Sequence, residues 1–216
     1  MARVLLNHGL GNHRPSTHWQ YLTAVALRKQ GHQVSYPQFP NPDAPNMADW
    51  QEVLVTEVCL LHELGEQAGE LIFIGHSLGG LNFIQAAVDR VLPTSFDRTL
   101  LVAPADPELL PDLSVGQLQL DAPGLSEAVH AVSGALTLVG SDLDPWQPKG
   151  VQATFGDPLG VTAKVIAGAK HFSYVDGWGP WHPGPGDSVP EHLLLEFAAL
   201  LRLERQRGGR AGQQTA

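Results

Sequence analysis

Short apolar runs along the chain alternate with segments in which apolar residues recur every three or four positions. The run Leu71–Ile74 is apolar at every position, which is typical of a strand buried on both faces of a parallel sheet. By contrast, Trp50, Leu54 and Val58 recur at the spacing of one helix face. This pattern predicts strands at Arg3–Asn7, Gln33–Tyr36, Leu71–Gly75, Thr99–Ala103, Ala135–Gly140 and Val161–Ile166.

Helices are predicted between these strands and after the last of them. The first begins near Trp19, the second is capped by Asn46, and the third covers Leu78–Val91. Ser188 and Glu191 form a capping-box pattern that opens a final helix. Strands that alternate with helices indicate an α/β protein, a three-layer α/β/α sandwich with a mostly parallel sheet.

One long stretch, Pro104–Gly134, is rich in Pro, Asp and Leu and is interpreted as irregular. A loop of this length in a compact domain is usually functional or partly helical. The total of 216 residues suits one domain, which we expect to cover residues 1–201. The remaining residues, 202–216, form a basic tail that we expect to be disordered.

The charge is unevenly distributed along the chain. The net charge is −9, but the tail carries four arginines against one glutamate, so residues 1–201 carry −12. An acidic body repels phosphates, and we therefore expect neither a nucleic-acid partner nor an anionic membrane surface. The single cysteine, Cys59, excludes an internal disulfide. With no apolar run near the roughly 18 residues that span a bilayer and no secretory leader pattern, we expect a cytoplasmic protein.

The pentapeptide Gly75-His76-Ser77-Leu78-Gly79 follows a predicted strand and opens a predicted helix. In this context the pattern Gly-x-Ser-x-Gly is typical of a nucleophile elbow, a sharp turn that lifts a serine hydroxyl clear of the sheet. The glycines remove side chains that such a turn would bring into collision. The alternative is a plain glycine-rich turn between strand and helix. We predict that Ser77 is a nucleophile.

A serine nucleophile needs a base and an acid that orients the base. His171 follows the last predicted strand, and Asp142 and Asp144 follow the strand before it. The carboxyl ends of these strands meet at the sheet edge where Ser77 also lies. Asp144 is favoured as the acid because Pro145 restricts its backbone, while Asp142 remains an alternative that would bond turn backbone groups instead.

Two backbone N–H groups are predicted to bind the oxyanion. One belongs to Leu78 at the start of the helix, and the other to Leu10 in the glycine-rich loop after the first strand. Four aromatic residues lie near the candidate triad in the sequence and would either line a shallow apolar rim or pack the loops. These residues are Trp146, Phe172, Trp178 and Trp181.

The remaining histidines are interpreted as packing or surface residues. His8, His13 and His18 recur at five-residue spacing, but no helical or strand period aligns them as zinc ligands. His76 lies inside the elbow, where its side chain points away from the nucleophile. Because no phosphate loop, dinucleotide fingerprint or metalloprotease motif is present, we expect no cofactor and no metal.

Together these motifs make the chain resemble the small serine hydrolases related to retinoblastoma-binding protein nine, a compact branch of the α/β-hydrolase superfamily. The resemblance runs from about residue 3 to residue 201. It is carried by His8-Gly9-Leu10-Gly11-Asn12 with His18-Trp19, by the elbow, by Asp144-Pro145, and by His171-Phe172 leading to Asp176-Gly177-Trp178-Gly179-Pro180-Trp181. It implies the triad Ser77, Asp144 and His171.

The expected activity is hydrolysis of small carboxylic esters, thioesters or amides through an acyl-enzyme. Because Pro104–Gly134 is too short for a deep lid, we expect a minimal cap and a preference for short acyl chains. The expected partner is a small-molecule ester. A protein-binding module with little activity and an acyltransferase are the alternative functions, although the sequence offers little support for a protein partner.

Overall fold

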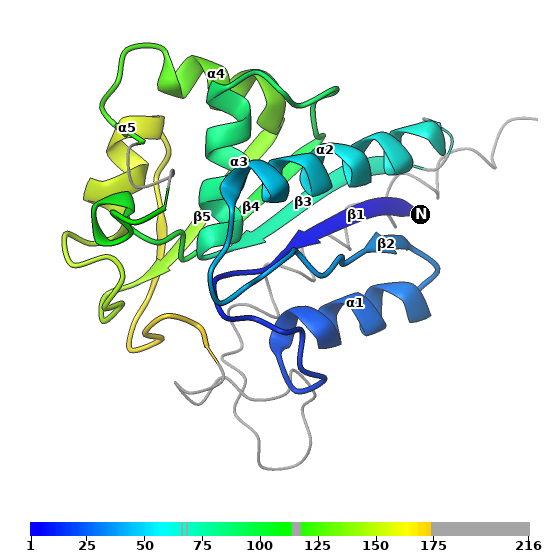
Figure 1. Cartoon of the computed structure of the whole chain (residues 1–216), viewed down its shortest axis with the longest axis horizontal. Coiled ribbons are helices and arrows are strands. Elements are labelled where there is room, and N and C mark those ends of the chain that lie inside the picture. Colours follow the sequence, from blue (N-terminus) through cyan, green and yellow to red (C-terminus); the bar gives the residue numbers. More distant parts are fainter. Residues whose placement is uncertain (66, 68, 114–117, 174–216) are drawn as a thin grey trace, which may run out of the picture.

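The computed structural model of the protein describes residues 1–65, 67, 69–113 and 118–173. Within these residues, six strands form one sheet in the order β2-β1-β3-β4-β5-β6, and every neighbouring pair is parallel (Figure 1). The strands are β1 (Ala2–Asn7), β2 (Gln33–Ser35), β3 (Glu70–His76), β4 (Arg98–Val102), β5 (Ala135–Ser141) and β6 (Lys164–Ile166).

Helices cover both faces of this sheet (Figure 1). The α-helices are α1 (Trp19–Lys29), α2 (Met47–Glu63), α3 (Leu78–Val88), α4 (Leu125–Ser133) and α5 (Asp157–Leu159), with a 3₁₀ turn η2 (Pro107–Leu109) and a π turn η4 (Gln152–Gly156). Leu100 of β4 belongs to the apolar cluster that contains Trp19 of α1. Its neighbour Leu101 belongs to the opposite cluster, with Trp50 of α2. The predicted α/β class is confirmed, because both sheet faces are buried.

The order of the strands reverses between β1 and β3. The chain passes from β1 to β2 on one side of the sheet and then returns to β3 on the other. At their carboxyl ends, Asn7 of β1 lies opposite Gly75 of β3. Open α/β sheets bind ligands in the crevice at such a reversal. Ser77 directly follows β3, so the candidate nucleophile lies at this point.

The stretch Pro104–Gly134 is partly helical, one of the alternatives expected for its length, because residues 125–133 form α4. Leu125 and Val129 are buried one turn apart and pack into the same core cluster as α2 and α3. This helix is only nine residues long and follows Gly124 in a left-handed conformation (φ 85°). Its apolar period is therefore short, and tertiary packing rather than local pattern stabilises it.

Two other elements are three residues shorter than predicted. The strand predicted from Val161 begins only at Lys164, because the Val161 N–H closes the α5 turn on the Gly156 carbonyl at 2.8 Å. The helix predicted to reach Val91 ends at Val88, and Arg90 follows in a left-handed conformation (φ 56°) that a helix cannot continue. Val161 packs against the core from a loop, and Val91 is exposed, so an apolar residue outside an element was interpreted as part of it in both places.

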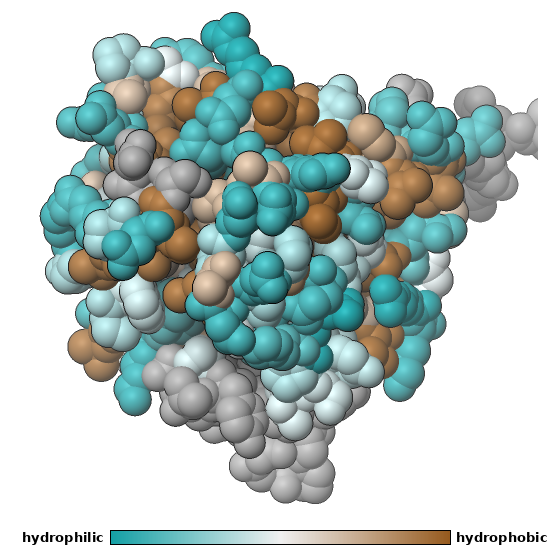
Figure 2. All heavy atoms as spheres, in the orientation of Figure 1, coloured by the Kyte–Doolittle hydropathy of each residue, from teal (hydrophilic) through white to brown (hydrophobic). Residues whose placement is uncertain are grey.

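The outer face formed by α2, α3 and α4 is mostly polar, with apolar residues between the polar ones (Figure 2). Leu60 near the end of α2 and Leu64 directly after this helix are exposed apolar side chains. Among the residues that the structure describes, no helix combines the length and apolar character needed to cross a membrane.

Several predictions fall on residues outside the described ranges. These are the final helix opened by Ser188, the rim residues Trp178 and Trp181, and the tail 202–216. The domain boundary at residue 201 also lies there and stays a prediction.

Candidate active site

Ser77 lies at the sharp turn between β3 and α3. Its backbone has φ 53° and ψ −124°, a conformation that costs free energy for any residue other than glycine. The turn is crowded: a Cβ on Gly75 would lie 2.7 Å from the ring of Phe73, and one on Gly79 would lie 2.4 Å from the Asn7 carbonyl oxygen. The two glycines of the motif are therefore required by the turn, as the sequence predicts.

His171 lies between Ser77 and Asp144. Its Nε2 is 2.8 Å from the Ser77 Oγ, and its Nδ1 is 3.0 Å from each carboxylate oxygen of Asp144. The Asp144 side chain is fully buried and also accepts a hydrogen bond from the backbone N–H of Trp146 at 2.9 Å. A carboxylate on Nδ1 favours the tautomer with the proton on that nitrogen, which leaves the Nε2 lone pair for the serine hydroxyl.

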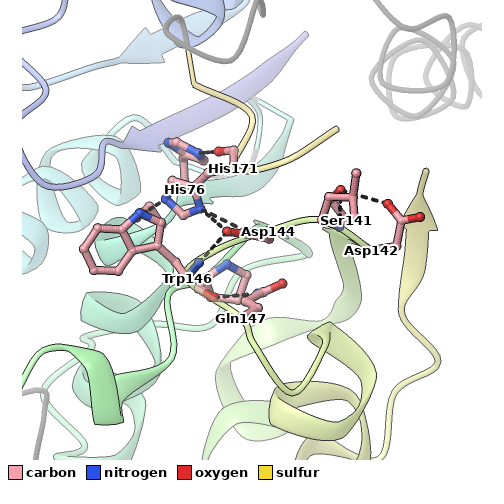
Figure 3. A network of polar contacts seen from close by, with 10 residues as sticks. His76, Ser141, Asp142, Asp144, Trp146, Gln147 and His171 are labelled. Carbon is pink, nitrogen blue, oxygen red and sulfur yellow. Dashed lines mark hydrogen bonds and ion pairs between the residues drawn. The ribbon is translucent and has the colours of Figure 1, made fainter. Parts of the chain in front are cut away.

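Asp142 faces a different group. Its carboxylate accepts the Gly168 N–H at 2.7 Å, and the Ser141 Oγ lies 3.4 Å from the same oxygen. Figure 3 shows His171 with Asp144 and His76 on either side of it, and Asp142 apart beside Ser141. Of the two acids that the sequence left in competition, only Asp144 contacts the imidazole.

The loop after β1 passes directly beside the nucleophile. A Cβ on Gly9 would lie 2.8 Å from the Ser77 Cβ and 3.3 Å from its Oγ. Leu78 is the first residue of α3, so its N–H has no partner within the helix. In the described part of the chain, neither the Leu10 nor the Leu78 N–H donates to a protein acceptor. Within the described residues, both N–H groups are therefore without a protein acceptor.

His8 holds this loop, a role that the sequence reasoning missed. Its Nδ1–H donates to the Gly9 carbonyl oxygen (2.9 Å), and its Nε2 accepts the Phe39 N–H (3.0 Å). Burial, with the nearby Arg14 charge acting in the same direction, lowers the pKa of His8 from 6.5 to about 4. His8 is therefore neutral near pH 7. Its place directly before a glycine at a strand end is the only sequence signal for this role.

The other histidines bond the protein in different ways. His18 is buried and accepts the Gln20 N–H on its Nδ1 (3.2 Å) as the cap of α1, and burial lowers its pKa to about 4. His13 is exposed and pairs with Asp43 at 2.9 Å. His76 is buried, as predicted for a packing residue, but its Nε2 also bonds the His171 carbonyl oxygen at 2.9 Å.

The two predicted rim residues that the structure describes, Trp146 and Phe172, lie in different surroundings. The ring of Trp146 is half-buried, with its centroid 6.0 Å from that of His171, so it borders the site. Phe172 is fully buried in the cluster that contains Val102 and Val139, which corresponds to packing and not to a rim. The expectation that Phe172 lines the surface is therefore corrected: the turn after His171 directs this side chain into the core.

Acid is expected to destabilise the protein through His8 and His18. Above pH 6.5 both are neutral whether folded or unfolded, but between pH 6.5 and about 4 only the unfolded chain binds their protons. The free energy of unfolding therefore falls with falling pH by about 3 kcal/mol for each histidine before it levels off below pH 4. Urea unfolding between pH 7.5 and 4, followed by tryptophan fluorescence, measures this fall.

The matched variant is His18→Asn, because asparagine is also a good helix cap but does not titrate. Its free energy of unfolding should fall between pH 7.5 and 5 by about 2 kcal/mol less than that of the wild type. The same pH dependence in both proteins would contradict the assignment.

A parallel sheet with a serine elbow at its reversal point defines the α/β-hydrolase fold. The family model for serine hydrolases matches residues 4–186, and the chain belongs to this family of hydrolytic enzymes. No curated protein matches the chain.

Solved structures share the fold. The ydeN gene product of Bacillus subtilis is 20% identical, with a TM-score of 0.66 over 82% of this chain and 91% of that one. A putative YdeN-like hydrolase from Pectobacterium atrosepticum is 20% identical, with a TM-score of 0.60 over 84% and 85%. Est1E from Butyrivibrio proteoclasticus, solved with ferulic acid, is 14% identical, with a TM-score of 0.59 over 94% and 89%. At these identities the likeness shows the fold alone.

Proposed function

We propose that the protein hydrolyses small carboxylic esters with Ser77 as nucleophile, His171 as general base and Asp144 as the acid that orients it. The observation that carries this proposal is the continuous contact from the Ser77 Oγ to the His171 Nε2 (2.8 Å) and from the His171 Nδ1 to Asp144 (3.0 Å). A serine hydroxyl is a weak nucleophile until a neighbouring base takes its proton. The membership of the serine hydrolase family supports the same reaction class.

The reaction proceeds in two halves. The Ser77 Oγ attacks the ester carbonyl while His171 takes its proton, and the C–O bond to the alcohol breaks as His171 returns the proton to the leaving oxygen. Water then attacks the acyl-enzyme with His171 again as base, which releases the acid and restores Ser77. Asp144 holds the imidazole and stabilises its charged form in both halves.

The negative oxygen of each tetrahedral intermediate is bound by the Leu10 and Leu78 N–H groups. Support for these donors comes from the packing of Gly9 against Ser77 and from the position of Leu78 at the start of α3. Each such donor contributes roughly 3–4 kcal/mol to transition-state stabilisation in enzymes where one has been removed.

Short acyl chains are the expected substrates. Between β4 and β5, where a lid would be inserted, the described residues form η2, α4 and the segments that connect them. We therefore expect no long apolar cover for a fatty chain. Among the described residues, Trp146 borders the imidazole of His171, with ring centroids 6.0 Å apart. The net charge of −9 further favours neutral or cationic esters over anionic ones.

A panel of p-nitrophenyl esters from acetyl to palmitoyl tests this proposal. We expect the acetyl and butyryl esters to have the highest kcat/KM, because the acyl group has only a shallow apolar surface to contact. A fluorophosphonate probe should label the protein, and mass spectrometry of its peptides should place the label on Ser77. Faster turnover of the palmitoyl ester would contradict the substrate class, and a label on another residue would contradict the nucleophile.

A further inference from the structure

His171 lies in a strained turn. Gly168 has φ 70°, and the two residues that flank His171, Lys170 and Phe172, have φ 51° and 55°. Residues other than glycine persist in this left-handed region only where the surrounding structure holds them. The position of the imidazole therefore depends on the contacts that anchor this turn.

Several contacts hold the turn, and three of those between described residues join it to other parts of the protein. Asp142 accepts the Gly168 N–H at 2.7 Å, and the Phe172 side chain is buried in the core. These two contacts restrain the neighbours of His171. The third is a hydrogen bond of 2.9 Å between the His76 Nε2 and the His171 carbonyl oxygen (Figure 3).

The direction of this bond follows from the surroundings of His76. The ring is packed against His171, His18 and Trp19, with centroids 5.2, 5.8 and 5.6 Å away. Burial, together with the neighbouring His171 and His18, holds the pKa of His76 well below its usual value, so the ring is neutral and carries one N–H. Because a carbonyl oxygen only accepts, the proton lies on Nε2 and His76 donates.

We propose that His76 is a positioning residue that keeps the His171 imidazole in reach of Ser77. His76 and Ser77 are adjacent residues of one tight turn. The same turn therefore positions the Ser77 hydroxyl and, through His76, holds the backbone carbonyl of His171. A displacement of a catalytic group by about 1 Å can lower kcat roughly 100-fold. A hydrogen bond to the His171 carbonyl oxygen restricts such a displacement of the imidazole. This proposal rests on the proposed function, in which His171 is the base.

Two substitutions at one position test the bond. His76→Leu fills the space without a donor, whereas His76→Gln places an amide N–H at similar reach. We expect His76→Leu to lower kcat for p-nitrophenyl butyrate by roughly 10- to 100-fold with KM changed less than about threefold, and His76→Gln to recover most of the loss.

The matched control is His130→Leu. His130 makes the same kind of bond, from its Nε2 to the Leu159 carbonyl oxygen at 2.8 Å, but it lies on α4 and contacts none of the candidate triad. We expect its kcat to equal that of the wild type. A loss of kcat in this control as large as in His76→Leu, or equal kcat for His76→Leu and His76→Gln, would overturn the positioning role.

A measurement on the wild type covers the case in which His76→Leu does not fold. Long-range ¹H–¹⁵N NMR distinguishes the two neutral tautomers of each histidine, and we expect His76 to carry its proton on Nε2 from pH 6 to 8. A proton on Nδ1 would overturn the proposal, because Nε2 could not then donate. Failure of the proposed function looks different: the wild type would neither turn over the esters nor react with the fluorophosphonate, whatever the tautomer of His76.

Discussion

Replacing Ser77 with alanine is expected to lower kcat for p-nitrophenyl butyrate by roughly 10⁶-fold, the loss seen when the nucleophile of a serine triad is removed. Alanine lacks the Oγ that lies 2.8 Å from the His171 Nε2, so no acyl-enzyme forms. The fluorophosphonate probe should no longer label the protein. Any activity that remains would come from the oxyanion donors and from binding alone.

The control for this substitution is Ser133→Ala. Ser133 is buried, as is Ser77, and its Oγ donates to the Val129 carbonyl oxygen at 2.6 Å within α4. Its loss should reduce the free energy of unfolding by about 1 kcal/mol and leave kcat and labelling unchanged. A Ser77→Ala protein that keeps wild-type turnover would refute Ser77 as the nucleophile.

Replacing Asp144 with asparagine is expected to lower kcat by about 10⁴-fold, as when the acid of a serine triad is converted to an amide. The two side chains have nearly the same shape, so the fold should be kept. An amide N–H facing the His171 Nδ1, however, favours the tautomer with the proton on Nε2. That nitrogen then cannot accept the proton of Ser77. Steady-state kinetics with p-nitrophenyl butyrate measure the loss.

Asp142→Asn is the matched comparison, because the same chemical change is made two residues away. The amide oxygen of asparagine can still accept the Gly168 N–H that Asp142 accepts. Its kcat should therefore stay within about threefold of the wild type, since neither triad contact changes. Equal losses in the two variants, or a larger loss for Asp142→Asn, would remove Asp144 from its proposed role.

Much of the fold could be predicted from local patterns. The predicted strand Leu71–Gly75 lies within β3 (Glu70–His76), and Asn46 caps α2 by accepting the Ala48 N–H at 2.9 Å. Such features depend on residues within one or two turns of each other, which is the range over which periodicity and capping act. The bounds of α4 could not be predicted, because this helix is short and packs against α3.

For the candidate site, too, some features could be predicted from the sequence and others needed the tertiary structure. Topology alone predicts that Ser77, Asp144 and His171 meet, because parallel strands end at one edge of the sheet. The choice between Asp144 and Asp142 needed the three-dimensional structure, because both follow β5 within three residues. Likewise, Phe172 is buried at a turn in which Lys170 and Phe172 both have positive φ angles. No local sequence pattern predicts these angles.

The sequence by itself determined the order of strands and helices, the elbow around Ser77 and the sheet edge at which the chemistry is expected. These features follow from hydrophobic periodicity, from the absence of side chains at Gly75 and Gly79, and from chain order. Only the tertiary structure decided which groups are in contact there. Asp144 contacts the His171 imidazole, His8 bonds the loop beside Ser77, and His76 bonds the His171 carbonyl oxygen. The last of these joins residues 95 positions apart, and such a contact depends on how all the elements pack.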